Sequence, residues 1–123
     1  MLTEKFMDVL AHEGVVSLVS WNTEEPHITN TWNSYIQVTP DQRLLAPAAG
    51  MKKLEENVAV NNRIKLTLGS REVMGYHSMG TGFALEGTVN FIDSGAEFDE
   101  MKAKFPFLNR VLEVTVPSIK QTL

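Results

Sequence analysis

Three β-rich runs follow one another within the first 48 residues of this 123-residue chain, with short turns between them. The runs are residues 15–21, 27–38 and 43–48, and the turns are residues 22–26 and 39–42. Turns of this length cannot hold the crossover that joins two parallel strands, so we expect antiparallel hairpins. Pro47 has no backbone donor, which predicts an edge strand or a bulge in the third run.

The rest of the chain adds three β-rich runs and, together with the N-terminus, three short helices. Strands are predicted at 64–68, 83–92 and 111–116, with a glycine-rich stretch at 69–82, a bulge at Gly87 and a tail at 117–123. Helices are predicted from a Thr3 cap to Gly14, over 51–61, and from a Ser94 cap to Pro106. Strands and helices do not alternate as in a parallel α/β fold. The sequence therefore predicts a mainly β fold, a six-stranded antiparallel barrel in one domain (1–123), although periodicity alone leaves an open α+β sheet as an alternative.

Composition excludes several function classes. The net charge of -4 gives no electrostatic reason to bind nucleic acid or an anionic membrane. The chain has no cysteine, which rules out thiolate catalysis, disulfides and iron–sulfur clusters. His12, His27 and His77 lack the spacing of zinc ligands, so no metal site is expected. The serines at 17, 20 and 34 have no partnered His-Asp arrangement, so no hydrolase triad is expected either. Apolar runs are too short to span a bilayer and the N-terminus does not read as a signal peptide, so we expect a cytoplasmic protein.

A possible phosphate site lies at the start of the second predicted helix. Residues 50–57 place a glycine and two lysines in its first turn. Free N–H groups and the helix dipole favour an anion there, and a bound phosphate would explain why Lys52 and Lys53 oppose the dipole. The alternative is that both lysines are solvated and balanced by Glu55 and Glu56.

Residues 30–35, Asn-Thr-Trp-Asn-Ser-Tyr, set two aromatic side chains among four polar ones. Alternation along a strand would give each face one aromatic plane beside hydrogen-bonding groups. Such a surface suits a flat heterocycle with polar edges. Equally, Trp32 and Tyr35 could fill the core while the polar groups lie on an exposed edge.

The order of these motifs resembles the small FMN-binding proteins of anaerobic, sulfate-reducing bacteria, in the split-barrel superfamily of pyridoxamine-phosphate oxidases and flavin reductases. The resemblance covers essentially the whole chain. It is carried by Glu13-Gly14-Val15-Val16, Pro26-His27, residues 30–35, Pro47, Gly50-Met51, Lys53, residues 57–59, residues 67–71, residues 80–83 and the terminal Gln121-Thr122-Leu123.

The resemblance implies a split barrel that works as a homodimer, with one FMN per subunit near the dimer interface. It implies cofactor contacts from Asn30, Thr31, Trp32, Asn33, Tyr35, Pro47, Ala48, Ala49, Gly50, Met51, Lys52, Lys53, Thr81, Gly82 and Leu123. Lys53 would meet the phosphate, and Leu123 would reach the flavin of the partner subunit. Glu13 and Phe107 map near the flavin. Leu54 stands where the family has Thr, and Phe107 where it has a second tryptophan, which leaves Trp32 as the main candidate beside the ring.

Two classes of function follow from this resemblance. An electron-transfer flavoprotein would serve an unidentified redox partner protein, and the small chain, with no evident acid/base group, favours this class. A flavin-dependent oxidoreductase, either a flavin reductase or a pyridoxamine-phosphate oxidase, is the alternative. The oxidase would need a second basic cluster, whereas Arg63, Lys65 and Arg71 are scattered. A barrel of the same class that binds haem or a deazaflavin is a third possibility, which an absorption spectrum separates from the others.

Overall fold

Seven strands form one antiparallel sheet among the described residues, in the order β2-β1-β5-β6-β7-β4-β3. The computed structural model describes residues 2–23 and 25–123, so residue 24 of the predicted turn at 22–26 lies outside it. The strands are β1 (Val15–Ser20), β2 (His27–Trp32), β3 (Gln37–Val38), β4 (Leu44–Ala48), β5 (Arg63–Met74), β6 (Met79–Ile92) and β7 (Arg110–Gln121). The helices are α1 (Glu4–Leu10), α2 (Lys52–Val60) and α3 (Ala96–Lys104), with a short 3-10 helix, η1 (Asn33–Tyr35).

The strand predicted over residues 27–38 is broken in two, so the predicted count of six strands was wrong. β2 pairs with β1 and β3 pairs with β4, and η1 separates them. The Asn33 side chain is buried at the break, and its Nδ2 donates to the main-chain oxygens of His12 and Gly69, both at 2.9 Å. These bonds draw the backbone out of the strand, so the predicted alternation of faces does not hold for residues 33–35.

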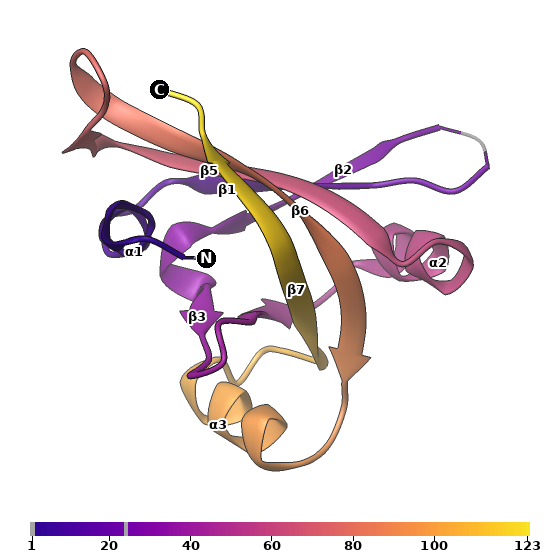
Figure 1. Ribbon diagram of the computed structural model, residues 1–123. Coiled ribbons are helices and arrows are strands. Elements are labelled where there is room, and N and C mark those ends of the chain that lie inside the picture. Colours follow the sequence, from indigo (N-terminus) through magenta and orange to yellow (C-terminus); the bar gives the residue numbers. More distant parts are fainter. Residues whose placement is uncertain (1, 24) are drawn as a thin grey trace.

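The sheet curls because its two edge strands are consecutive in the chain. β2 and β3 lie at opposite ends of the strand order, and η1 spans the opening between them (Figure 1). The result is the curled antiparallel split barrel that the sequence predicts. Its interior holds apolar side chains from α1, α2 and the sheet, including Phe6, Leu18, Leu54, Ile64, Leu85 and Leu112.

Three strands are longer than predicted. Residues 69–82 do not form a loop, because β5 continues to Met74 and β6 begins at Met79. The predicted tail at 117–123 is mostly strand, since β7 continues to Gln121. Gly87 lies at the expected bulge, where the register between β6 and β7 shifts. A Cβ atom there would lie 2.2 Å from the main-chain oxygen of Thr115, so only glycine allows this approach.

The helix ends follow the predictions in part. Thr3 caps α1, where its Oγ1 accepts from the N–H of Phe6 at 3.2 Å, but α1 ends at Leu10 rather than at Gly14. The predicted Ser94 cap of α3 is wrong. Gly95, at φ 103°, is the N-cap, and no side chain caps that end.

A buried polar contact holds α2 on the sheet. The sequence predicts Leu54, Val58 and Ala59 as its buried face, yet Ala59 is exposed and Asn57 is fully buried beside Leu54. Asn57 Nδ2 donates to Ser20 Oγ at 3.1 Å, and Asn57 Oδ1 accepts from Asn22 at 2.8 Å. Satisfied buried amides of this kind fix one orientation of a helix.

Candidate functional site

Three aromatic rings form a cluster that we call the aromatic wall: Tyr35, Phe105 and Phe107. The ring centroids of Tyr35 lie 5.2 Å from Phe105 and 5.6 Å from Phe107, and the two phenylalanines lie 6.1 Å apart. These separations are typical of favourable aromatic pairs. Phe107 remains 51% exposed, so one side of the wall is open to a ligand.

The segment from Pro47 to Lys53 adjoins this wall through the main chain. Asn109, two residues after Phe107, donates its N–H to the oxygen of Ala48 at 2.9 Å. Pro47 and Ala48 are buried, whereas Ala49 and Gly50 are exposed. Pro47 lies beyond the pairing of β4 with β3, which reaches only Leu45, so the strand is an edge there as predicted.

The start of α2 is open to an anion. Met51, partly buried, is its N-cap, and no side chain of the described residues caps it. Lys52 and Lys53 are exposed, and Lys53 Nζ lies 4.0 Å from Glu56 Oε1, too far for a strong ion pair. Glu55 on the same helix accepts from Arg110 at 2.7 Å, which anchors this turn to β7. Uncapped N–H groups beside two loosely held lysines suit a phosphate.

At the end of β2, some of the predicted cofactor-binding residues are exposed and others are buried. Trp32 is 45% exposed, and Asn30 is exposed with its Nδ2 donating to Ser17 Oγ at 3.1 Å. Thr31 and Asn33 are buried. Asn33 is fully buried and its backbone N–H donates to the oxygen of Gly14 at 2.9 Å, so this residue supports the site from behind.

A second group of predicted residues lines an open groove of about 740 Å³. Glu13, Thr81 and Leu123 line it, together with Ser70 and Arg71. The Thr81 hydroxyl and the Gln121 amide donate to the main-chain oxygen of Leu123, at 2.7 and 2.9 Å. Gly82 is buried just behind, where its oxygen accepts from Thr122 at 2.8 Å. The side chain of Leu123 itself is 64% exposed.

Glu13 is held by the residue that precedes Tyr35. The Ser34 hydroxyl and backbone N–H donate to its two carboxylate oxygens at 2.6 and 3.1 Å. These bonds, the hydroxyl first, hold the pKa of Glu13 below its ordinary value of 4.5. Glu13 is therefore ionised at neutral pH and brings one fixed negative charge to the rim of the groove.

The start of α2 and the groove of Leu123 lie at opposite ends of the subunit, whereas Ser34 and Trp32 lie near that groove, through the bond of Ser34 to Glu13 and the pairing of Trp32 with Val15. Lys52 shares a groove with Val89, near the end of β6, whereas Leu123 is bonded to Thr81 near its start. Eight residues of β6 separate Thr81 from Val89, about 26 Å at the rise of a strand. Figure 1 likewise shows α2 and the C-terminus far apart. One FMN-sized ligand therefore cannot contact both Lys53 and Leu123 of the same subunit.

Sequence reasoning missed one residue and one contact of the site. Phe105 completes the aromatic wall, and its place only two residues before Phe107, after the helix, is the signal that could have found it. Ser34 binds Glu13 across 21 positions of the sequence, and no local motif announces that contact.

Two features are absent from the described residues. Within 2–23 and 25–123, no three His, Asp or Glu side chains are grouped so as to hold a metal ion. None of the helices described has the length and apolarity to cross a bilayer.

The curled antiparallel sheet, with its aromatic wall and uncapped helix start, defines the split-barrel class of protein. Comparison with known proteins agrees with this class. The chain belongs to the pyridoxamine 5'-phosphate oxidase family, whose model matches residues 2–122.

Individual relatives extend this assignment. The chain is 43% identical over 123 residues to an FMN-binding protein of Nitratidesulfovibrio vulgaris, and the match covers all of both chains. Two solved structures share the fold. HupZ from Group A Streptococcus is 16% identical with a TM-score of 0.76, covering 98% of this chain and 94% of HupZ. An FMN-binding protein from Syntrophomonas wolfei subsp. wolfei is 14% identical with a TM-score of 0.71, covering 88% of this chain and 76% of that one.

Proposed function

We propose that this protein binds FMN and transfers electrons between redox partners, as a homodimer with one FMN per subunit near the dimer interface. The observation that carries the FMN assignment is the full-length 43% identity to a protein named as FMN-binding. FMN supplies one- and two-electron redox chemistry when bound, and the protein supplies its binding, orientation and electrostatic environment.

The open start of α2 fits the phosphate of FMN. Lys53 binds the phosphate by a charge-assisted contact, and Lys52 adds to the local positive potential. Uncapped N–H groups of α2 donate to the remaining phosphate oxygens. Leu54, where the family has Thr, is fully buried, so one hydroxyl contact of the family is replaced by core packing.

The aromatic wall fits the flavin ring. Trp32, Tyr35 and Phe107 offer aromatic surface, and the turn from Pro47 to Met51 offers backbone groups to the polar ring edge. Because Trp32 and Phe107 are about half exposed, a ring held here keeps an edge near solvent. An accessible edge suits electron exchange with a second protein, for which no buried substrate cavity is needed.

A dimer explains the second group of residues. Leu123 lies too far from Lys53 to serve the same cofactor, so it serves the flavin of the partner subunit. The contact is isologous, because each subunit offers the same residues to the other. Glu13 and Thr81 share the groove of Leu123, and they line the same side of the partner's site.

Oxidation of a pyridoxamine phosphate is the second candidate, because the matching family model bears that enzyme's name. An oxidase needs basic groups for the phosphate of its substrate in addition to those for FMN. Arg71 lines the groove together with Glu13 and Leu123 and could serve, but Glu72 lines it as well. We therefore place electron transfer first.

The test begins with the absorption spectrum of the purified protein. We expect flavin bands, release of FMN on acid denaturation, and one FMN per chain on titration of the apoprotein. A Soret band or a deazaflavin spectrum would contradict the cofactor. The reduced holoprotein is then mixed with a one-electron acceptor protein, and separately the oxidised holoprotein with pyridoxamine 5'-phosphate. Turnover of pyridoxamine phosphate would reverse the order of the two candidates.

A further inference from the structure

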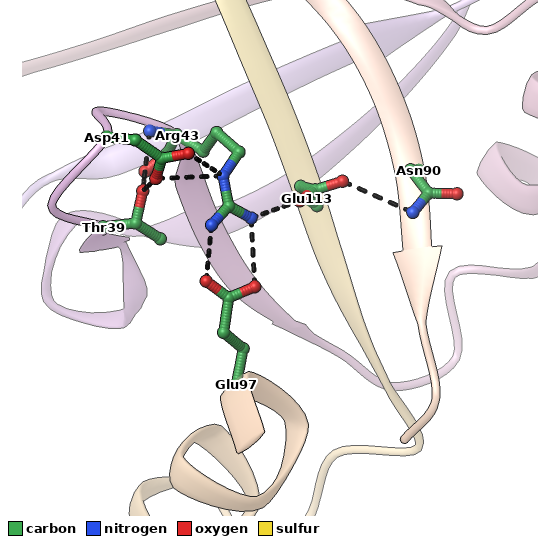
Figure 2. Close-up of polar contacts among 6 residues, drawn as sticks. All are labelled: Thr39, Asp41, Arg43, Asn90, Glu97 and Glu113. Atoms are coloured by element: carbon green, nitrogen blue, oxygen red, sulfur yellow. Dashed lines mark hydrogen bonds and ion pairs between the residues drawn. The ribbon is translucent and has the colours of Figure 1, made fainter. Parts of the chain in front are cut away.

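One arginine ties three parts of the fold together at the start of α3. Arg43 precedes β4, and Figure 2 shows its guanidinium between three carboxylates. Its Nε donates to both oxygens of Asp41 at 3.1 and 3.0 Å. Its Nη1 and Nη2 donate to the two oxygens of Glu97, at 3.0 and 2.5 Å, and Nη1 also contacts Glu113 of β7. Because the guanidinium is planar and donates to both oxygens of one carboxylate, the contact fixes the relative orientation of the two groups as well as their distance.

The charges of this cluster make Arg43 indispensable to it. Hydrogen bonds from Arg43 lower the pKa of Asp41 to about 2 and hold the pKa of Glu97 below its ordinary value. The Arg43 side chain is only 22% exposed, so solvent screens the group less than it screens a surface ion pair. Without the guanidinium, three carboxylates would face one another.

Apolar packing of α3 rests on two of its side chains. Met101 is buried, and Phe98 is partly buried against the same small cluster of Leu45, Leu108 and Val111. A cavity of about 130 Å³ lies between α3 and the β3–β4 hairpin, lined in part by Val38, Leu45 and Met101. Polar side-chain contacts join α3 to the β3–β4 hairpin at both ends of the helix. Glu97 meets Arg43 at one end, and Lys104 Nζ donates to Gln37 Oε1 at 2.9 Å at the other.

The turn that follows α3 is a stiff extension of the helix and carries two rings of the aromatic wall. The N–H of Phe105 donates to Met101 at 2.7 Å, and the N–H of Leu108 donates to Phe105 at 3.1 Å. Lys102 Nζ donates to the oxygen of Leu108 at 2.7 Å. A displacement of α3 therefore displaces Phe105 and Phe107 relative to Tyr35.

We propose that Arg43 is a positioning residue for the cofactor site. Its two hydrogen bonds to Glu97 fix the position of α3. The position of α3 in turn fixes the rings of the aromatic wall, against which the ring of the cofactor packs. This inference rests on the proposed function for the part that concerns FMN. Arg43 acts on the cofactor site through the position of α3 and not through the net charge of the cluster, in which three carboxylates face one guanidinium.

The experiment compares R43Q, R43K, E97Q and the double variant R43Q/E97Q with the wild type. The double variant keeps the formal charge of the cluster because it loses one positive and one negative group. K65Q is the matched control, since Lys65 forms an exposed ion pair with Glu86 at 3.0 Å on strands β5 and β6. FMN affinity and the visible circular dichroism of bound FMN are measured for each protein. The apoproteins are also labelled with para-fluorophenylalanine for fluorine NMR, with Phe105 and Phe107 assigned from F105L and F107L.

We expect R43Q and R43Q/E97Q to weaken FMN binding about tenfold, which is ~1.4 kcal/mol, and to change the visible circular dichroism. R43K should lie between R43Q and the wild type, and K65Q should match the wild type. The fluorine resonances of Phe105 and Phe107 should shift in R43Q and E97Q. Wild-type affinity in the double variant would show that charge alone matters and would overturn the inference.

Unchanged resonances of Phe105 and Phe107 in the Arg43 and Glu97 variants would also overturn it. If R43Q fails to fold, R43K and E97Q decide the result by the same criteria. Failure of the wild type to bind FMN would contradict the proposed function, whereas the fluorine spectra of the apoproteins would still decide whether Arg43 positions the wall.

Discussion

The hydroxyl of Thr81 donates a hydrogen bond to the main-chain oxygen of Leu123 at 2.7 Å, which fastens the last residue to the start of β6. Thr81 is buried, and the Gln121 amide donates to both groups, at 3.2 Å to the hydroxyl and 2.9 Å to the oxygen. The position of Leu123 over its groove therefore depends on a side chain of a different strand.

Replacing Thr81 with valine should release the end of the chain. Valine keeps the shape of the side chain but loses the hydrogen bond, at a cost of about 1 kcal/mol in the free energy of unfolding. Urea unfolding measures the cost, and hydrogen exchange should accelerate at Gln121 and Thr122. T88V is the control, because Thr88 is exposed on the same strand. Equal exchange rates in T81V and wild type would mean that β7 holds its end without this bond.

Deleting Leu123 should weaken the proposed dimer and change the reduction potential of FMN. Full burial of a leucine side chain is worth about 1.5–3 kcal/mol, and an isologous dimer loses two such contacts, so half-burial of each should raise the dimer dissociation constant by about tenfold or more. Analytical ultracentrifugation and a redox titration measure the two effects. L123I, which keeps the apolar volume, should behave as wild type. A deletion variant with an unchanged dissociation constant and potential would remove Leu123 from the partner's site.

Lys53→Ala should weaken FMN binding more than Lys52→Ala does. Both lysines are exposed at the start of α2, and Lys53 has only a long contact to Glu56 at 4.0 Å to give up. Loss of a charge-assisted phosphate contact should cost about 1.5–3 kcal/mol of binding free energy. Titration of each apoprotein with FMN gives the two affinities. Equal affinities for wild type and K53A would place the phosphate elsewhere.

Trp32 fluorescence should be strongly quenched in the holoprotein and restored when FMN is removed. The measurement uses the Trp21→Phe background, because Trp21 also emits and lies under the guanidinium of Arg63 at 5.6 Å. Trp32 is 45% exposed at the end of β2, so a ring on the proposed site would lie within quenching range. Emission that does not respond to FMN in this background would separate Trp32 from the ring.

Ser34→Ala should raise the pKa of Glu13 and change the stability of the protein in acid. Because the folded-state pKa of Glu13 lies below its unfolded value, its ionisation adds stability above pH 4.5, and that stability is lost as the pH falls through the folded pKa. S34A removes the hydroxyl bond, so its stability should vary less over this acid window than that of wild type. Urea midpoints between neutral pH and about pH 3 measure the difference. S118A, an exposed serine of β7, is the control, and parallel curves for S34A and wild type would contradict the assignment.

The parts of the fold that local sequence determines were predictable. The runs at 15–21 and 43–48 became β1 and β4, and Thr3 caps α1 as its position before the apolar stripe indicates. The break at Asn33 was not predictable, because its partners His12 and Gly69 lie 21 and 36 positions away. Contacts between residues so far apart in the chain produce no periodic pattern in the local sequence.

Glycine concealed the long β5–β6 hairpin. Residues 69–82 read as a loop since glycine is unfavourable in strands, yet two of these glycines are needed where the strands approach closely. A Cβ atom at Gly69 would lie 2.7 Å from the oxygen of Thr81, and one at Gly82 would lie 3.0 Å from the oxygen of Leu68. The same residues that indicated a loop therefore permit the pairing.

The sequence predicted which residues form the candidate site, but it did not predict how those residues are arranged in space. The resemblance grouped Tyr35 with Phe107, and the structure brings these two rings together at 5.6 Å. The separation of Lys53 from Leu123 follows only from the length of β6. The Arg43 cluster escaped prediction because Asp41, Glu97 and Glu113 belong to three elements, with no spacing that marks them as partners.

The strand order also sets the sequence in which the sheet can assemble during translation. β1, β2, β5 and β6 are neighbours in the sheet and lie within the first 92 residues, so they can pair before the C-terminal part leaves the ribosome. β4 must wait, because its neighbour besides β3 is β7, with Ala46 opposite Leu112. Until β7 is translated, the apolar β3–β4 hairpin has no strand to complete its sheet. Closure of the barrel is therefore the last step in the folding of the nascent chain. Until then, the edge of Leu44–Ala48 that will pair with β7 is open to aggregation and to chaperones.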